Sequence, residues 1–397
     1  MNLASSESNL PMNKCRLLTP IILAVLASCS TKESSENTEA KSIDFSSTID
    51  TLEIDTVIVD TGDDFLYLNS GLFVSDKSHD SKYLYNFDKI RHSLQIIDLE
   101  NLVLEQNIPL ELDGPNGIGS EWISNLYSTT NDNLLLTDHY QVSIIDKEGK
   151  KSMGFLYDKN DFEGNKLPEG LRIGFQKALS KDGNMLFTTY TDQKLGEPVY
   201  GIAWFDLENN HFGYKPLEVF KDLEKYRSTL YINDSPMRTV EAAIYLQPHN
   251  DSLIFSYSVK NEFHFYNLKT DSLTKKIYKS KYTSDQAEGN YPKRTETEQE
   301  FQEVLFAHNN KDVTYGQPFY DDVNNVYWRF SRELKETGYL TVLTAFDPSF
   351  NQLQEELLPK EYMYSNKPFA RGGMIYTPLV MNEELSFVRL KPKDPHE

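Results

Sequence analysis

The sequence contains few of the residues that usually carry catalysis, metal binding or cross-links. Its 397 residues include only two cysteines, Cys15 and Cys29, and its eight histidines form neither an HExxH motif nor another cluster with metal-ligand spacing. A cysteine-based zinc site and a disulfide network are therefore excluded. The Gly-rich stretch 114–120 is neither a GxGxxG fingerprint nor a Walker A loop, because no Gly-Lys-Ser or Gly-Lys-Thr follows it. The sequence consequently names no substrate and no reaction.

Positive charge is also scarce. The chain has 40 Lys and Arg residues against 60 Asp and Glu, which gives a formal net charge of −20. A surface this acidic disfavours nucleic acid and anionic lipid as general partners. We therefore predict no nucleic-acid partner, and the simplest role of the charge is solubility.

The one long apolar run lies near the N-terminus and predicts a targeting segment. Leu17–Ala27 follows a short basic region and is too short to cross a bilayer. It ends at Leu26-Ala27-Ser28-Cys29, which resembles the lipobox of bacterial lipoproteins. We therefore predict a signal peptide over residues 1–28, starting at Met1 or Met12, and lipid attachment at Cys29. The alternative is a chance cysteine at the end of an ordinary secretory signal.

The segment that follows the predicted cleavage site is polar. Residues 30–48 are rich in Ser, Thr and Glu and cannot bury a core, so we predict that residues 29–48 are a lipidated cysteine followed by a flexible tether. Acyl chains on one residue plus such a tether anchor a protein to a membrane without spanning it. The predicted location is the outer membrane of the cell envelope, on its periplasmic or its surface face.

Aromatic residues, by contrast, are abundant, with 24 Tyr and 22 Phe, and they occur in a repeated pattern. Residues 133–157 contain three short apolar runs separated by polar turns, which is typical of a strand meander. The pattern occurs six times, in residues 82–110, 133–157, 185–210, 253–278, 326–347 and 374–390, usually with a further candidate strand upstream. Four strands per unit of about 45 to 65 residues predict an all-β fold, a single six-bladed β-propeller of four-stranded antiparallel blades over residues 49–397.

Several segments have a structural role in this prediction. The last copy lacks a fourth strand, and Thr51–Val59 is expected to supply it and close the ring. The recurrent acidic residue after the third strand is expected to accept hydrogen bonds from turn amides; it is found at Asp98, Asp146, Asp206 and Asp347, with Asn267 in the fourth copy. The stretch 114–120 is expected to be a tight loop between blades.

Two insertions interrupt the repeats. Leu217–Leu230 predicts a weak amphipathic helix, and Thr295–Asn309 predicts a better one, with acidic residues in its first turns. Packing against the rim of the propeller is favoured over a lid for both. No cofactor is indicated. Asp158–Asn165 has carboxylates at calcium-like spacing but fails the EF-hand pattern, so calcium stays an open alternative there.

The candidate binding residues follow from topology. In a four-strand meander, the turn between strands two and three and the connection into strand one lie on the same face, where propellers usually bind ligands. This face is expected to collect Arg91, His92, Asn116, Glu121, Trp122, Asp138, His139, Tyr140, Arg172, Arg238, Tyr339 and Arg371. Arg172, Arg238 and Arg371 predict a cationic mouth for a carboxylate, sulfate or phosphate group. The alternative is that each pairs with a neighbouring Asp or Glu. Asp138 and His139 suit either an acid/base pair or a turn.

The lipobox, the tether, the six repeats, the closing strand and the loop Asp113-Gly114-Pro115-Asn116-Gly117 together resemble six-bladed propeller lipoproteins of Gram-negative bacteria. These form a domain-of-unknown-function group related to NHL-type propellers, and the loop departs from the commoner Gly-x-Gly-Pro-Gly. The resemblance implies no catalytic residues. We therefore favour a non-enzymatic, membrane-anchored binding module for an acidic glycan, a peptide or an envelope protein. The alternative is a calcium-dependent, lactonase-like hydrolase or lyase.

Overall fold

The computed structural model describes residues 52–68, 72–249, 252–360, 362, 365, 367–381 and 384–396. The chain divides into two units, Met1–Asp44 and Phe45–Glu397, and all described residues belong to the second. The predicted signal peptide, Cys29 and the tether lie outside the described residues and stay predictions. Within those ranges, no helix is long and apolar enough to cross a membrane.

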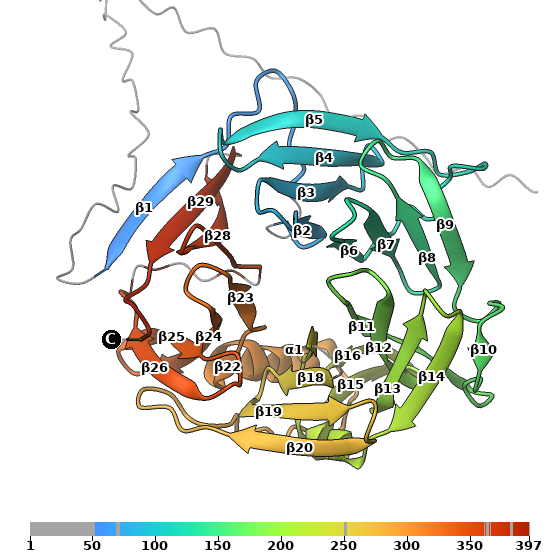
Figure 1. Cartoon of the computed structure of the whole chain (residues 1–397). Coiled ribbons are helices and arrows are strands. Elements are labelled where there is room, and N and C mark those ends of the chain that lie inside the picture. Colours follow the sequence, from blue (N-terminus) through green and yellow to red (C-terminus); the bar gives the residue numbers. More distant parts are fainter. Residues whose placement is uncertain are drawn as a thin grey trace, which may run out of the picture. The chain divides into compact units, whose positions relative to one another are not determined.

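Six sheets follow one another around a ring (Figure 1). The first contains β2 (Ser75–Lys77), β3 (Tyr83–Asp88), β4 (Ser93–Asp98) and β5 (Val103–Pro109). The second contains β6 (Asn125–Ser128), β7 (Leu134–Thr137), β8 (Gln141–Ile145) and β9 (Lys151–Leu156). The third contains β11 (Leu171–Leu179), β12 (Met185–Asp192), β13 (Val199–Asp206) and β14 (His211–Pro216), with β10 (Glu163–Gly164) added in parallel to β14.

The other three sheets repeat this meander. The fourth contains β17 (Ile244–His249), β18 (Ser252–Tyr257), β19 (Lys260–Asn267) and β20 (Ser272–Ile277). In the fifth, β22 (Thr314–Tyr315) and β23 (Phe319–Asp321) both pair with β24 (Val326–Lys335), and β25 (Gly338–Phe346) and β26 (Gln352–Leu357) follow. The sixth contains β27 (Phe369–Arg371), β28 (Met374–Met381) and β29 (Glu384–Lys391).

The prediction that the N-terminal strand completes the last sheet is confirmed. Strand β1 (Glu53–Ile58) pairs antiparallel with β29, from Glu53 opposite Lys391 to Ile58 opposite Ser386. The two ends of the described chain are therefore joined in one sheet, so no strand edge of the ring is left open at that point. The whole arrangement is all-β and consistent with a β-propeller.

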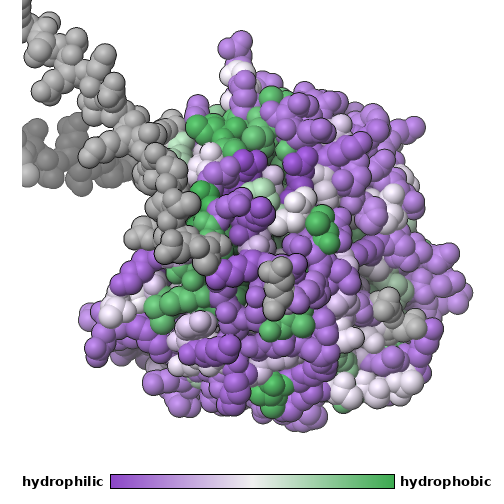
Figure 2. All heavy atoms as spheres, turned by 60° about the vertical axis from the view of Figure 1, so that its left-hand side comes forward, coloured by the Kyte–Doolittle hydropathy of each residue, from purple (hydrophilic) through white to green (hydrophobic). Residues whose placement is uncertain are grey.

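The ring is held together by apolar side chains between successive sheets. Phe205 on β13 is fully buried, and its ring centroid lies 5.2 Å from that of Phe155 on β9 of the preceding sheet. Middle strands such as β7 and β12 are almost entirely buried because neighbouring sheets cover both of their faces. On the side of the ring that carries β1 and β29, apolar residues form patches within a mostly hydrophilic surface (Figure 2).

The turn predictions are also confirmed. Asp98 Oδ1 accepts the backbone amides of Glu100 (2.7 Å) and Asn101 (2.9 Å), and the equivalent acids and Asn267 do the same in their turns. The stretch 114–120 is a tight loop between β5 and β6. At Gly117, an added Cβ would lie 2.5 Å from the Leu112 carbonyl oxygen, so only glycine fits there.

A seventh, three-stranded sheet was not predicted. Strands β15 (Ser228–Ile232) and β16 (Ser235–Val240) form a hairpin, and β21 (Arg294–Thr295) pairs in parallel with β15. Helix α1 (Glu298–Phe306) packs on this sheet through Phe301 and Val304, which are buried against Leu230 and Val240. A π-helical turn, η2 (Ala307–Lys311), continues α1. We call β15, β16, β21, α1 and η2 the inserted lobe; in Figure 1 its labelled elements α1, β15 and β16 lie behind the β17–β20 sheet.

The two predicted helices are present, with corrections. The first is a 3₁₀ helix, η1 (Glu218–Tyr226), because its apolar residues recur every three positions, which matches three residues per turn. Its Phe220 packs on Phe255 of the ring, with ring centroids 5.3 Å apart. The second helix is α1, which begins with a capping box of Thr297 and Glu300 and packs on the new sheet. The further strands expected upstream in the repeats are present as the first strands of their sheets: β2, β6, β11, β17 and β23.

Candidate functional site

One end of the ring collects the connections in which the candidate residues lie. Neighbouring strands run antiparallel in each four-strand meander. The turn between the second and third strands therefore lies at the same end as the connection into the first strand. We call this end the ring face. Both insertions leave and re-enter the ring there, the first between β14 and β17 and the second between β20 and β22.

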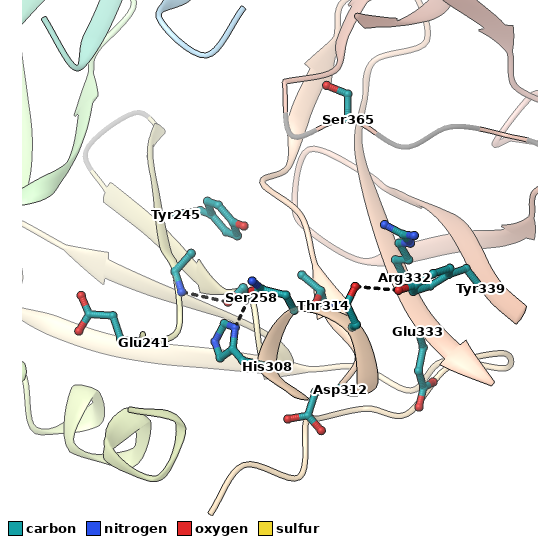
Figure 3. A pocket seen from close by; sticks show the side chains of 13 residues that line it. Glu241, Tyr245, Ser258, His308, Asp312, Thr314, Arg332, Glu333, Tyr339 and Ser365 are labelled. Carbon is teal, nitrogen blue, oxygen red and sulfur yellow. Dashed lines mark hydrogen bonds between the residues drawn. The ribbon is translucent and has the colours of Figure 1, made fainter. Parts of the chain in front are cut away.

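A cavity of about 630 Å³ lies between the inserted lobe and two neighbouring sheets of the ring (Figure 3). Its walls come from the entry to β17, the end of β18, the β22–β24–β25 region and η2. The lining is mostly polar: Glu241, Ala243, Tyr245, Ser258, His308, Asn309, Asn310, Asp312, Thr314, Arg332, Glu333, Tyr339 and Ser365. A concave site with aromatic side chains and a few convergent polar groups is the usual form of a small-molecule site.

Arg332 and Tyr339 form a cationic wall of this cavity. They lie on β24 and β25, and the guanidinium carbon of Arg332 is 3.5 Å from the centroid of the Tyr339 ring. The Tyr339 hydroxyl donates to Asn310 Oδ1 at 2.8 Å, so η2 holds the ring in place. Among the described residues, no carboxylate forms an ion pair with Arg332. A guanidinium fork without such a partner suits a carboxylate or sulfate on a ligand.

Two acids of the cavity wall are already held by other groups. The Asp312 carboxylate accepts hydrogen bonds from two backbone amides and from the Tyr291 hydroxyl. Glu333 accepts hydrogen bonds from the backbone amide and the hydroxyl of Ser284, each at 2.8 Å, and pairs with Lys335 at 2.6 Å. Their negative charges are therefore compensated locally and oppose an anionic ligand less than free carboxylates would.

Glu241 and His308 offer polar groups of a different kind. Burial raises the pKa of the Glu241 carboxyl, and the nearby cations Arg227 and Arg172 oppose this shift. A carboxyl with a raised pKa keeps its proton to a higher pH and can donate a hydrogen bond. His308 Nδ1 lies 3.1 Å from Asn309 Oδ1, whereas its buried Nε2 has no hydrogen-bond partner in the described part of the chain.

The structure brings together four of the residues predicted from the sequence. His139 packs edge-on against Phe175 with ring centroids 4.2 Å apart, and Arg172 lies 5.5 Å from the centroid of the same ring. Tyr140 stands beside His139 and is 73% exposed. Burial lowers the pKa of His139, the cations Lys177 and Arg172 lower it further, and Asp138 opposes them.

Asp138 itself is buried in a turn. Its Oδ1 accepts the backbone amides of Tyr140 at 2.6 Å and Gln141 at 2.9 Å. These hydrogen bonds stabilise the turn, as the aspartates do in the other turns of the ring.

Lys177 belongs to this region and was missed by the sequence analysis. It is buried on β11, where a bulge separates Ile173 from Lys177, and its Nζ donates to the Gly174 carbonyl at 3.0 Å. Burial lowers its pKa to about 8, while Asp138 opposes the shift. A lysine in an otherwise strand-like sequence carries no signal of burial, because the bulge that turns it inward depends on the register with β12.

The other predicted residues lie elsewhere. Arg238 is on β16 of the inserted lobe, where it pairs with Glu298 and covers the ring of Phe301 at 5.0 Å. Arg371 ends β27, at the opposite end of the sheet from the ring face, and its Nε donates to the Ser81 carbonyl at 2.9 Å. The three arginines thus lie on three different sheets. Ligand binding by any of them stays a prediction.

Trp122 is 68% exposed in the connection into β6, where Lys89 lies 5.4 Å from its ring centroid. Tyr339, which the sequence placed on the ring face, lines the cavity there. Its partner Arg332 was missed, because only the folded hairpin and η2 bring it to the cavity wall.

No metal site is apparent among the described residues, where no group of three or more His, Cys, Asp or Glu side chains is placed to hold an ion. In the stretch 158–165, Phe162 is buried in the core, and Glu163 and Gly164 pair with β14. The calcium-dependent alternative stays a prediction.

The fold and the cavity define a ring of β-sheets with a ligand-sized site on one face. The chain belongs to the family described as Domain of unknown function (DUF4221), whose model matches residues 48–357. The predicted resemblance to a propeller group of unknown function is thereby confirmed. Among curated proteins, no sequence matches the chain.

Solved structures of similar fold include relatives from Bacteroides. A DUF4221 family member from Bacteroides vulgatus ATCC 8482 is 14% identical, with a TM-score of 0.58, covering 86% of this chain and 99% of that one. A protein from Bacteroides fragilis NCTC 9343, described as a candidate exported protein, is 12% identical with a TM-score of 0.49 and covers 86% and 95%. Streptogramin B lyase is 8% identical with a TM-score of 0.40 and covers 85% and 96%. Identities this low concern the fold alone, and a TM-score below 0.5 supports no argument about function.

Proposed function

We propose that this protein is a lipid-anchored, non-enzymatic binding module of the outer membrane, which holds a small acidic sugar in the cavity beneath the inserted lobe. In this proposal the six sheets of the ring are the blades of a six-bladed propeller, and Cys29 is acylated. One observation carries the proposal. Arg332 is stacked on Tyr339 in the wall of a polar cavity and, among the described residues, has no carboxylate partner.

The remaining cavity groups suit a sugar acid. A ligand carboxylate can pair with the Arg332 fork, its hydroxyls can meet the Glu241 carboxyl and other polar groups of the lining, and the C–H side of a pyranose can pack against an aromatic ring of the cavity. In Figure 3, Tyr245 and Ser258 lie on the other side of the site from Arg332 and Tyr339. The cavity is thus lined on two sides by groups that bind polar, ring-shaped molecules.

The test is calorimetric titration of the full chain, purified in detergent, with galacturonate and glucuronate and with neutral galactose as comparison. We expect the acids to bind and galactose not to bind. Arg332→Gln should weaken binding about 10- to 100-fold, because a hydrogen bond to a charged group contributes roughly 1.5–3 kcal/mol. The matched control is Arg238→Gln, whose guanidinium already pairs with Glu298.

Failure of every acid to bind, or unchanged binding in Arg332→Gln, would refute the proposal. Adding calcium or a chelator to the same titration tests the hydrolase alternative, for which binding has to depend on calcium.

A further inference from the structure

The ring face carries a second feature that the cavity does not use. Four large aromatic side chains are exposed on three consecutive sheets: Phe65 (51%), Trp122 (68%) and Tyr140 (73%) in connections at the ring face, and Phe175 (43%) in the bulge of β11. We call these four residues the aromatic face. Aromatic rings grouped in this way on a soluble surface usually mark an interaction site.

Cations accompany the aromatic face. The guanidinium of Arg91 lies 5.2 Å from the ring centroid of Phe65, and Arg172 lies 5.5 Å from that of Phe175. Lys89, in the turn after β3 of the first sheet, lies 5.4 Å from the centroid of the Trp122 ring, in the connection into β6 of the second sheet. This contact links the first two sheets. These cations are local positive charges on a chain whose net charge is −20.

The acids nearest to these cations in the turns present little charge to solvent. Asp88 and Asp138 are buried, and each accepts hydrogen bonds from the amides of its own turn. Three exposed acids lie beside the aromatic face in sequence: Asp63 and Asp64, which precede Phe65, and Glu121, next to Trp122. The complementarity to an acidic partner is therefore confined to the cations themselves, Arg91, Lys89 and Arg172, and does not extend over the whole face.

The aromatic face leads to the cavity. Phe175 contacts His139 and lies under Arg172, and β11, which carries Phe175 and Arg172, contacts β17; the connection into β17 carries Glu241, which lines the cavity. The cavity and the Arg172–Phe175 pair therefore lie on adjacent sheets of the ring, and Tyr140 lies beside His139 on the next sheet. A ligand that extends from the cavity toward β11 passes both an aromatic ring and a cation.

We propose that the ligand is an acidic polysaccharide, with one sugar residue in the cavity and the rest of its chain lying across the aromatic face. The inference rests on the proposed function of the cavity. Each residue of a uronic acid polymer offers a flat C–H face, which stacks on an aromatic ring, and a carboxylate, which pairs with a cation. An apolar peptide would use the rings but not the cations, and an anionic bilayer would not enter the cavity.

The experiment is a chain-length series on the full chain. The probes are uronate monomers and their oligomers of two to eight residues, from pectin, alginate and glycosaminoglycan, with neutral oligomers of equal length. Because each added contact is intramolecular once the first residue is bound, affinity should rise at least 10-fold from monomer to hexamer and then level off. Neutral oligomers should show no such rise.

Variants separate the two sites. Trp122→Ala/Tyr140→Ala should reduce the affinity for the hexamer to near that for the monomer and leave the monomer unaffected, whereas Arg332→Gln should weaken both. The matched control is Tyr282→Ala, another exposed aromatic residue away from the aromatic face. Equal melting temperatures of these variants would verify that they fold.

Each result has one meaning. If no acidic oligomer binds more tightly than its monomer, or if the double variant binds the hexamer like the wild type, the polysaccharide inference is wrong while the cavity proposal stands. If no monomer and no oligomer binds, the proposed function itself fails. If acidic and neutral hexamers bind equally, the cations have no role and the ligand class is wrong.

Discussion

The sheets of the ring and the inserted lobe differ in how their strands find partners. In the ring, strands that follow one another in sequence pair through short turns, such as the Asp98 turn between β4 and β5. In the lobe, β15 comes from the first insertion and β21 from the second. The two strands pair in parallel, with Thr229 opposite Arg294. Apart from the closing pair β1–β29, the ring is thus built from local strand pairs, whereas the lobe combines the local β15–β16 hairpin with the non-local pair β15–β21. The cavity lies where the two meet.

The largest expected effect concerns closure of the ring. Deleting residues 51–59 removes β1 and leaves β29 with an unpaired edge. It also removes Val59, which packs in the same cluster as Leu385 and Phe387. We expect loss of cooperative thermal unfolding, measured by calorimetry and circular dichroism. Deleting the predicted tether, residues 30–48, is the control and should leave the melting transition unchanged. A deletion variant that lacks β1 and still melts cooperatively would show that the ring does not depend on closure.

Matched phenylalanine substitutions sharpen the comparison. Phe205→Ala opens the packing between two ring sheets and should lower the free energy of unfolding by about 3–5 kcal/mol. Phe301→Ala affects a small cluster formed with Leu230, Val240 and Val304. It should change the global value by less than about 1 kcal/mol while hydrogen exchange accelerates in α1 and β15. Equal global losses in urea unfolding would mean that the lobe and the ring unfold as one unit.

The same contrast explains how much could be predicted from the sequence. The ring was predictable because its signals are local: apolar runs, turn acids such as Asp146 and Asp206, and the apolar pattern of Thr51–Val59. One local signal in the lobe was missed. Asn233 and Asp234 both have positive φ (50° and 61°), and two such residues between apolar runs favour a tight hairpin, here β15–β16.

Other features could not be read from the sequence. Strand β21 has only two residues, which are too few to show a periodic pattern. Its parallel partner β15 lies about 65 positions away in the sequence, so the pairing could not be predicted either. The cavity requires η2 to meet the β24–β25 hairpin, and the bond from Tyr339 to Asn310 exists only in that arrangement. Residues placed by topology alone, such as Tyr140 and Arg172, were found on the ring face, whereas Arg332 required the tertiary structure.

The buried lysine of the ring, Lys177, should make the stability of the protein depend on pH. Burial lowers the pKa of Lys177 in the ring to about 8, whereas an unfolded lysine keeps a pKa near 10.4. Between these values the unfolded chain binds more protons, so this group makes the free energy of unfolding rise as the pH increases from about 8 to about 10. Lys177→Met should lack this rise and be more stable at pH 7, by an amount on the order of 1–3 kcal/mol. Urea unfolding at pH 7 and 9.5 measures the difference, with the exposed Lys147→Met as control. Equal pH dependence in Lys177→Met and the wild type would contradict the buried charge.

The smallest effect is expected for the ion pair of the lobe. The side chains of Arg238 and Glu298 are 50% and 57% exposed, and water and salt screen such pairs. Arg238→Ala, Glu298→Ala and the double variant should form a cycle with a small coupling energy that shrinks further in 1 M salt. Arg238 also covers Phe301, so its single variant should lose more stability than the Glu298 variant. A large coupling energy that persists in 1 M salt would mean that this pair holds α1 on the three-stranded sheet. The lobe would then depend on charge where the ring depends on apolar packing.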